Sequence, residues 1–361
     1  MSNNNQTTEN NVEVKQNNKV VEVKAKDVAK DKKKKDKVKK PNKVAKALKQ
    51  KGHQVVMLDV FFGLEESADF SAEQDFSKDA EILKNRKNEI TNEKIAEYGI
   101  MGPHVFETCK AADIVFIGLH GENGEDGKIQ AIFENTGIPY TGSDSKSSAI
   151  AMSKAETKQL LTPFIKMPKG IIITKEEARF GITDALRIKA PCVMKPSNGG
   201  SSLGVLIVHD DSEYEKALEK DFQFDSTVLV EEYIRGRELT QGVLDGQALP
   251  PVEICPDKDT WYDYENKYNG KTKEICPALI PDHVLKEMSE ISVKIGELIG
   301  LSVYYRIDYL LDENETLFAL EANSLPGMTD TSLVPQEAAA VGISYPDLCE
   351  KIIEISLRKY E

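Results

Sequence analysis

Four polar residues near the C-terminal end of the chain could form a binding site for a divalent cation. Arg306 and Asp308 stand two residues apart in one apolar segment, and Glu321 and Asn323 stand two apart in the next. Because side chains alternate along a strand, each pair should share a face, and pairing of the strands across a turn at 312–315 would bring all four together. Two carboxylates and an amide oxygen are ligands that magnesium prefers, and magnesium also contacts phosphate groups. A surface ladder of ion pairs is the alternative interpretation of this hairpin.

A glycine-rich loop is a candidate for binding an anion. Residues 197–204 read SNGGSSLG and lie between two predicted strands, where glycines let backbone N–H groups approach an anion closely. Ser201 and Ser202 add hydroxyl donors, and Lys195, just before the loop, carries a cation that could reach a phosphate. The pattern differs from the P-loop, G-x-x-x-x-G-K-[ST], and a flexible hairpin turn accounts for the loop equally well.

Two further segments could contact a ligand. The segment 231–238 (EEYIRGRE) is predicted to be extended, so its backbone could contact an adenine edge and Glu238 could accept from ribose hydroxyls. The segment 120–127 (HGENGEDG) links a predicted strand to a predicted helix, the usual place of a ligand in an open α/β sheet. Its glycine spacing is not the G-x-G-x-x-G of dinucleotide-binding proteins.

The elements that must position these residues follow from hydrophobic periodicity. Buried strands at 55–62 and 112–121 alternate with helices at 43–54 and 127–136, which predicts a parallel, doubly wound α/β layer. The elements predicted after this layer are one helix from Ser147 that carries Lys154 and Lys158, strands near 170–174, 192–195, 204–208 and 227–234, β-structure to about 253, a helix from about 283 to 300, strands at 301–311 and 317–324, and a helix at 345–358.

Charge is divided unevenly along the 361 residues. The formal net charge is −13, but the segment from Lys24 to Lys51 carries +11 and the part from Gly52 onwards carries −23. Such an acidic body would repel phosphate backbones, which argues against a general nucleic-acid-binding protein. No apolar run approaches the roughly 18–20 residues that span a bilayer, and no signal-peptide pattern is present, so we expect a cytoplasmic protein without membrane contact. The five cysteines are scattered, which argues against a disulfide framework or a zinc site.

The N-terminal residues 1–41 are predicted to be a disordered, lysine-rich extension, with ordered structure beginning near Asn42. The lysine run could attach the protein to an anionic surface, or it could be a solvated, partly helical segment.

Taken together, the motifs resemble those of a known family, the D-alanine–D-alanine ligases of the ATP-grasp superfamily. The resemblance extends from about Asn42 to Ile353, with six blocks in the family's order. They are HGENGEDG at 120–127, GIPYTGS at 137–143, MKPSNGGSSLGV at 194–205, YDYENKY at 262–268, RID at 306–308 and EANSLPGMTDTSLVP at 321–335. The resemblance implies an α/β, ATP-grasp fold. It has an N-terminal doubly wound domain at 42–143, a central ATP-grasp subdomain at 144–229 and a C-terminal domain at 230–361.

The resemblance also implies an activity. Members of the family join two D-alanines at the expense of ATP, through an acyl phosphate, for peptidoglycan synthesis. The implied cofactors are ATP as co-substrate and Mg²⁺ or Mn²⁺, with two ions, and the implied assembly is a homodimer. The residues that match family positions are catalytic Arg306, Ser201, Tyr268 and Gly327; ATP-binding Lys154, Lys195, Ser202, Glu231, Ile234, Glu238 and Lys267; substrate-binding His120, Glu125, Ser332 and Leu333; and metal-binding Asp308, Glu321 and Asn323.

The N-terminus departs from the family pattern. Members begin with a strand and a loop of the type G-G-x-S-x-E-x-x-V-S, whose glutamate binds the first D-alanine. Here the lysine run stands in that place, and Glu22 has the right type in a different context. Ser153 also stands where the family has aspartate before Lys154. We therefore hypothesise a ligase whose first-substrate subsite is weakened or differently built.

Tyr268 indicates an amine nucleophile and a dipeptide product, since relatives that make D-alanyl-D-lactate carry histidine in that loop. The alternatives are another carboxylate–amine ligase, for example one that makes D-Ala-D-Ser, and a nucleotide-binding homologue with impaired turnover.

Overall fold

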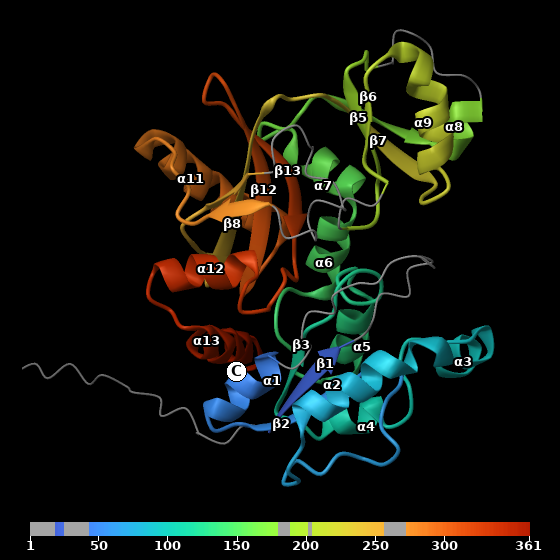
Figure 1. The fold of residues 1–361 in the computed structure, drawn as a ribbon, viewed down its shortest axis with the longest axis vertical. Coiled ribbons are helices and arrows are strands. Elements are labelled where there is room, and N and C mark those ends of the chain that lie inside the picture. The colour runs from blue at the N-terminus through green and yellow to red at the C-terminus, as the bar shows by residue number, and fades with distance from the viewer. Residues whose placement is uncertain (1–18, 25–42, 180–187, 201–203, 256–271) are drawn as a thin grey trace, which may run out of the picture.

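The chain folds into three units, each built around its own sheet (Figure 1). The computed structural model describes residues 19–24, 43–179, 188–200, 204–255 and 272–361. The expectations for 1–18 and 25–42 lie outside the described residues. The first unit holds a three-stranded sheet, the second a four-stranded sheet, and the third a six-stranded sheet. This α/β arrangement agrees with the fold expected from the sequence.

The N-terminal sheet has the order β2-β1-β3, and both pairings are parallel. Strand β1 (Lys19–Lys24) lies in the centre, between β2 (Gln54–Asp59) and β3 (Ile114–Ile117). The expectation that order begins near Asn42 is therefore wrong for residues 19–24. The segments before and after β1 are polar, so the composition of the N-terminal segment as a whole does not indicate a strand. Yet Val20 and Val21 of β1 are fully buried.

Glu22 lies in the middle of this central strand and is fully buried. Its carboxylate accepts a hydrogen bond of 2.9 Å from the backbone N–H of Ala45, at the start of helix α1 (Lys43–Gln50). A carboxylate at a helix N-terminus is stabilised by the unpaired N–H groups and by the helix dipole. Glu22 therefore connects β1 to α1.

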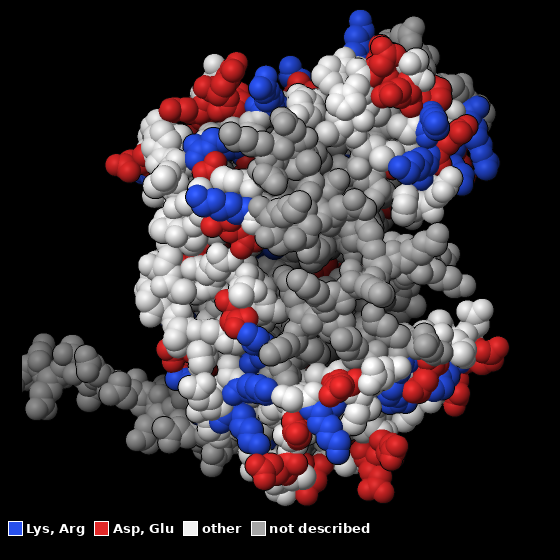
Figure 2. Space-filling view, viewed as in Figure 1, with Lys and Arg blue, Asp and Glu red and all other residues white. Residues whose placement is uncertain are grey.

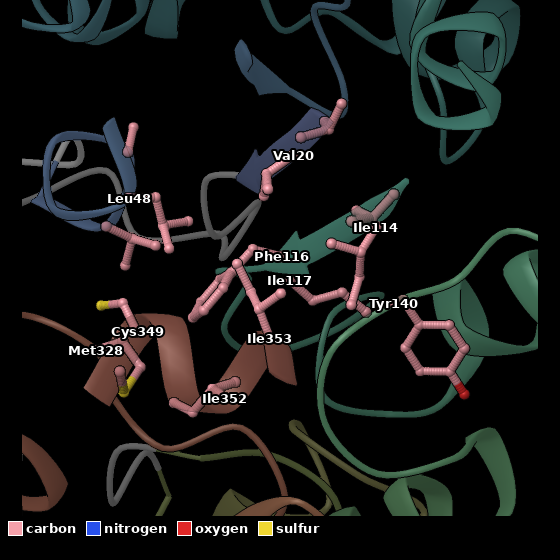
Figure 3. Packing of buried hydrophobic residues seen from close by; sticks show 14 of the residues in the cluster. Val20, Leu48, Ile114, Phe116, Ile117, Tyr140, Met328, Cys349, Ile352 and Ile353 are labelled. Atoms are coloured by element: carbon pink, nitrogen blue, oxygen red, sulfur yellow. The ribbon is translucent and has the colours of Figure 1, made fainter. Parts of the chain in front are cut away.

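The C-terminal helix α13 (Tyr345–Leu357) packs against the N-terminal sheet and not against its own unit alone. Ile352 and Ile353 of this helix share one apolar cluster with Val20 and Phe116 of the sheet (Figure 3). Figure 1 places α13 beside α1, and Lys51, just after α1, forms ion pairs with two carboxylates of α13. The first and last parts of the chain thus form one core.

The helix predicted from Ser147 is in fact two helices, α6 (Ser145–Met152) and α7 (Lys154–Leu161). Ser153 between them has an extended backbone, and its hydroxyl accepts from the N–H of Glu156, 3.3 Å away, as the N-cap of α7. Serine is a favoured N-cap because its oxygen satisfies an otherwise unpaired N–H of the first turn. The break gives Lys154 the first position of a new helix.

The central sheet has the order β4-β7-β5-β6 and is antiparallel throughout. Its strands are β4 (Gly170–Thr174), β5 (Cys192–Pro196), β6 (Leu206–Val208) and β7 (Thr227–Glu232). The sequence places a domain boundary between residues 229 and 230, which is inside β7. Since β7 pairs with β4 and β5 over its whole length, residues up to 232 belong to the central sheet. Strands β5 and β6 pair as expected on either side of the glycine-rich loop.

The C-terminal sheet runs β11-β10-β8-β12-β13, with β9 paired to β8. Its strands are β8 (Gly236–Leu244), β9 (Gln247–Ala248), β10 (Val252–Cys255), β11 (Lys273–Ile275), β12 (Tyr304–Asp312) and β13 (Leu317–Asn323). Helix α11 (Asp282–Ile299) covers one face, where Met288 and Ile295 join Tyr305, Ile307 and Tyr309 in an apolar cluster. Arg306 and Asp308 are left for the other face, as the alternation predicts.

The remaining elements complete the layers around the three sheets. They are α2 (Phe76–Asn85), α3 (Asn92–Tyr98), α4 (Val105–Lys110), α5 (Lys128–Thr136), α8 (Lys175–Arg179), α9 (Tyr214–Asp221), α12 (Leu333–Ala340) and the short 3-10 helices η1 (Arg86–Glu89), η2 (Asp211–Glu213) and η3 (Arg358–Tyr360). None of the five cysteines, which all lie within the described ranges, forms a disulfide. Within the described ranges, no helix is both long and apolar enough to cross a bilayer.

Replacing Asp221, the last residue of α9, by asparagine is expected to stabilise the protein above neutral pH. The side chain is fully buried, and within the described part of the chain neither carboxylate oxygen has a hydrogen-bond partner. Burial raises the pKa of Asp221 to about 7. The unfolded carboxyl loses its proton near pH 3.8, so native stability falls as the pH rises from there through 7.

We expect Asp221→Asn to increase the free energy of unfolding by about 1–3 kcal/mol at pH 8, with little change at pH 4. Urea unfolding at both pH values measures this. Glu219→Gln, on the exposed side of the same helix, is the control. Parallel pH profiles for Asp221→Asn and the unsubstituted protein would contradict the prediction.

Candidate active site

A pocket is lined by residues of the central sheet, the C-terminal sheet and α7. Figure 1 shows α7 between these two sheets. The lining combines residues of the central and the C-terminal units. The lining residues are Lys154, Pro168, Val193, Lys195, Pro196, Gly199, Gly200, Val205, Glu231, Glu232, Ile234, Glu238, Asp308, Leu310, Leu320 and Glu321. Seven of the residues predicted to bind ATP or metal are in this set: Lys154, Lys195, Glu231, Ile234, Glu238, Asp308 and Glu321. Residues up to 167 positions apart in the sequence therefore face one cavity.

One buried carboxylate in this pocket is shared by two lysines. The Glu231 side chain, on β7, lies 2.8 Å from Nζ of Lys158 and 2.6 Å from Nζ of Lys195. All three side chains are less than 10 % exposed. Burial alone would raise the pKa of Glu231, but the two cations outweigh it and hold that pKa below its ordinary value. The cluster carries a net positive charge, which suits an anionic ligand.

Lys158 was not among the predicted site residues, although a signal for it exists. It follows Lys154 by four positions on α7, and residues at that spacing lie on the same side of a helix. Its Nζ also donates to the carbonyl of Pro168, so it joins α7 to the segment before β4. Lys158 positions Glu231, which in turn contacts Lys195.

Lys154 connects the glycine-rich loop to the hairpin. Its Nζ donates to the carbonyl of Gly199 at 2.5 Å and lies 3.5 Å from the carboxylate of Glu321. Glu321 is 31 % exposed, so this pair retains access to solvent and to a ligand. The two serines predicted to bind ligand in this loop, Ser201 and Ser202, lie outside the described residues.

Strands β12 and β13 pair as predicted across the turn at 312–315. Arg306 lies opposite Asn323 and Asp308 lies opposite Glu321, with a bulge immediately after Asp308. Nε and Nη2 of Arg306 each donate to a different oxygen of Asp308 at 2.7 Å, and the hydroxyl of Thr240 donates to Asp308 at 2.6 Å. Burial alone would lower the pKa of Arg306, but the Asp308 carboxylate raises it, so the guanidinium stays charged.

Thr240 was also missed by the sequence analysis. It lies on β8 directly opposite Asp308, and only the pairing of β8 with β12 places it there. Asn323, at the end of β13, uses its side-chain oxygen to accept from the N–H of Leu325 at 3.1 Å.

The predicted first-substrate residues come together beside the pocket. His120 Nδ1 lies 3.1 Å from Oε1 of Glu125, in the loop between β3 and α5. The hydroxyl of Ser324, next to Asn323, donates to the carbonyl of Glu125 at 3.5 Å. A Cβ added at Gly200 would lie 4.0 Å from Glu125, so the glycine-rich loop also reaches this loop.

The predicted second-substrate residues are adjacent to one another at the start of α12. Ser332 is the N-cap residue of this helix, and Leu333 is its first residue. The Ser332 hydroxyl lies 2.7 Å from that of Thr329 and would be 3.0 Å from a Cβ at Gly327. Gly327 therefore lies close to Ser332, at the start of α12. Lys267 and Tyr268, predicted to close over the reaction, lie outside the described residues.

Charges outside the pocket are mixed. Figure 2 shows basic and acidic side chains interspersed over the described surface of that face. The lysines at 154, 158 and 195 are brought together by folding, so the local positive charge does not require a broadly basic surface. This agrees with the −23 carried by the chain from Gly52 onwards.

Comparison with known proteins identifies the family. A family model described as D-ala D-ala ligase N-terminus matches residues 38–143, and one described as D-ala D-ala ligase C-terminus matches 148–354. A D-alanine–D-alanine ligase of Pediococcus pentosaceus is 41% identical over 326 residues, covering 86% of this chain and 91% of that protein. One of Lacticaseibacillus casei is 37% identical over 327 residues, covering 88% and 90%.

Solved structures give the same result. The D-alanine–D-alanine ligase of Bacillus anthracis has a TM-score of 0.70 and 30% identity, covering 95% of this chain and 98% of that one. Its structure complexed with ATP has a TM-score of 0.69 and 28% identity over the same shares. The VanG D-Ala:D-Ser ligase of Enterococcus faecalis has a TM-score of 0.73 and 26% identity, covering 94% and 100%. With both family models matched and a pocket formed by residues of its motifs, this chain belongs to the D-alanine–D-alanine ligase family and has the ATP-grasp fold.

Proposed function

We propose that this chain joins two D-alanines into D-alanyl-D-alanine, with ATP converted to ADP and phosphate. The observation that carries the proposal is the pocket whose lining includes the cations of Lys154 and Lys195 and the carboxylates of Asp308 and Glu321. Phosphoryl transfer depends mainly on positioning and on neutralising charge, and this lining supplies cations for phosphate oxygens and carboxylates for a metal. The relatives described above carry the name of this activity.

The adenosine would lie between the two sheets. Ile234, through its backbone, and Glu231 would contact adenine, and Glu238 would accept from the ribose hydroxyls. Glu231 also holds Lys158 and Lys195, so a base that contacts Glu231 would lie beside both lysines, and Lys154 and Lys195 would contact the phosphates. Ser202 and Lys267 are further proposed ATP contacts.

Magnesium fits the hairpin by the chemistry of its donors. Asp308, Glu321 and Asn323 offer two carboxylates and an amide oxygen on directly paired strands, a hard oxygen set. Among the described residues no group of three histidine, cysteine or acidic side chains could hold a metal, and the set at this hairpin is two carboxylates with one amide. When bound, Mg²⁺ or Mn²⁺, as two ions, would neutralise charge on the transferring phosphate.

The reaction would then follow from groups of the chain. A carboxylate oxygen of the first D-alanine, held near His120 and Glu125, attacks the γ-phosphorus, and ADP leaves. The amine of the second D-alanine, whose carboxylate is held at Ser332 and Leu333, attacks the carbonyl carbon of the acyl phosphate. Arg306 and the N–H of Gly327 stabilise the oxyanion as phosphate leaves. Ser201 and Tyr268 complete the proposed catalytic set.

Purified full-length protein should release phosphate from ATP only when D-alanine and Mg²⁺ are present. Phosphate release and mass spectrometry of the product measure this, with L-alanine and added EDTA as controls. We expect one D-alanyl-D-alanine per phosphate and no release with either control. Absence of release with any D-amino acid would contradict the ligase function.

The same assay tests the first-substrate subsite. Because no G-G-x-S-x-E-x-x-V-S loop occurs in the sequence, we expect the first D-alanine to bind weakly. The dependence of phosphate release on D-alanine concentration gives both affinities. Affinity at the first site equal to that of a relative with the complete loop, assayed in parallel, would contradict the altered subsite.

We further propose a cytoplasmic homodimer that takes only small-molecule substrates, ATP and D-alanine, without a nucleic-acid or membrane partner. Light scattering of the purified protein measures the assembly.

A further inference from the structure

Glu337, on α12, is a fully buried carboxyl group that the proposed reaction does not use. Its Oε2 accepts a hydrogen bond of 2.7 Å from the backbone N–H of Gly242 on β8. Its Oε1 is buried and, among the described residues, has no hydrogen-bond partner. A buried acid held by one backbone bond is costly unless its position has a use, since an apolar side chain would fill the space without that cost.

Gly242 lies at a gap between two ladders of β8. Thr240 pairs with β10, and Val243 and Leu244 pair with β9. Between them, the Gly242 carbonyl accepts from the N–H of Leu249 at 2.8 Å, and its own N–H donates to Glu337. The Glu337 side chain therefore occupies the place of a strand partner.

Glycine is required at position 242 for this contact. A Cβ there would lie 2.2 Å from Oε2 of Glu337 and 3.1 Å from Val334, both on α12. A side chain at 242 would therefore displace Oε2 of Glu337 from the Gly242 N–H and press on Val334. Glu337 and Gly242 thus form a matched pair across the interface of α12 with β8.

This interface lies next to Arg306 on one side and next to the proposed contacts of the second substrate on the other. Gly242 is directly opposite Arg306 in the β8–β12 pair, and Arg306 and Glu337 are close enough for the charge of each to shift the pKa of the other. At its other end, α12 begins with Ser332 and Leu333, the proposed contacts of the second substrate. A shift of α12 along β8 would therefore change the distance between the second substrate and Arg306.

We propose that Glu337 is a positioning residue for the ligation step: by accepting from the Gly242 N–H, it holds the start of α12 in register with the strand pair that carries Arg306. This inference rests on the proposed function. Glu337 contacts neither substrate, and its effect reaches the reaction only through Ser332 and Leu333.

The contact needs an acceptor and not a charge. Burial raises the pKa of Glu337 well above its ordinary value, and an N–H bond to its carboxyl oxygen needs only an acceptor, whether or not the group is charged. A glutamine carbonyl can accept the same N–H bond, whereas methionine fills similar space without an acceptor. Glu337→Gln and Glu337→Met therefore separate positioning by the hydrogen bond from simple filling of the core.

The test is steady-state kinetics of the full-length protein with D-alanine and ATP. We expect Glu337→Met to raise the KM for the second D-alanine about tenfold or more, because a displacement of about 1 Å in a substrate contact has effects of that order. The KM for ATP should stay within about twofold, since none of the proposed ATP contacts lies on α12, the element that the substitution displaces. Glu337→Gln should restore the KM for D-alanine to near the unsubstituted value. Ala339→Met, on the exposed side of α12, is the control for the methionine.

Gly242→Ala tests the same contact from the strand. We expect it to raise the KM for the second D-alanine as Glu337→Met does. The double change Gly242→Ala with Glu337→Ala should cost no more than Gly242→Ala alone, because the shorter side chain removes the clash. This pair also carries the test if Glu337→Met does not fold.

Two results would overturn the inference. One is a lower melting temperature for Glu337→Met with an unchanged KM for D-alanine, which would make Glu337 a stability residue while leaving the ligase function intact. The other is absence of dipeptide formation by the unsubstituted protein, in which case the proposed function fails and this inference fails with it.

Discussion

Replacing Arg306 by alanine is expected to lower kcat about 100- to 1000-fold, the usual cost of removing a group that stabilises a developing oxyanion. The guanidinium is held by two bonds of 2.7 Å to Asp308, so it is already in place before substrate arrives. Its side chain is 14 % exposed, and in such a partly dry site its charge acts strongly on the transition state. The KM for ATP should change less than kcat, because Arg306 does not itself line the nucleotide pocket, although its partner Asp308 does.

Arg237 is a matched control for this variant. It forms a similar two-bond pair with Glu253, at 2.7 and 2.6 Å, on β8 and β10. Arg237→Ala should leave kcat unchanged. Arg306→Lys should recover only part of the activity, because a lysine keeps the charge but cannot form both bonds to Asp308. If Arg306→Ala keeps more than about one fifth of the unsubstituted kcat, the catalytic role is excluded. A loss of kcat of less than about fivefold is far smaller than the loss expected on removing a group that stabilises the transition state.

Glu231→Ala is expected to have the largest effect on stability and to abolish ATP binding. It leaves the cations of Lys158 and Lys195 buried beside each other without a counter-charge, which costs about 3–5 kcal/mol of unfolding free energy. Urea unfolding measures the loss, and calorimetric titration with ATP measures the binding. Adding Lys158→Met to the variant should recover part of the stability, because one uncompensated cation is removed.

The neighbouring residue provides the control. Glu232 is the next residue of β7, is half-buried, and accepts from the N–H of Lys169 at 2.8 Å. Glu232→Ala should cost only about 1 kcal/mol, the usual value of one hydrogen bond. Equal costs for the two variants would show that the lysine cluster does not depend on Glu231.

The pH dependence of the same cluster has a defined sign. The pKa of Glu231 is lower in the folded protein than in the unfolded chain. Its contribution to stability is therefore complete above the ordinary pKa of 4.5 and is lost as the pH falls through the folded value.

The hairpin of β12 and β13 could be predicted because its information is local. The alternation of Arg306 with Asp308 and of Glu321 with Asn323, with a short turn between the strands, sets both the register and the shared face. The glycine-rich loop between β5 and β6 could be located for the same reason. Its contacts with Lys154 and Glu125 could not, since they depend on how α7 and the β3–α5 loop approach it.

Strand β1 could not be predicted because a central parallel strand is defined by its neighbours. Its pairing partners β2 and β3 begin 35 and 95 residues later in the chain. Six residues with three valines, surrounded by lysine and asparagine, have no periodic signal long enough to be distinguished from a polar segment. The break at Ser153 was missed for the opposite reason, because one capping hydroxyl interrupts an otherwise continuous helical pattern.

By itself, the sequence determined the family, the fold class and the residue types of the site, because these depend on short motifs and on the alternation of side chains within single strands. The tertiary structure alone decided which of these groups act together. Lys158 meets Glu231 across 73 positions, and Gly242 meets Glu337 across 95. Such contacts arise when separate sheets and helices pack, and no local pattern records which buried cation or acceptor a distant element will present.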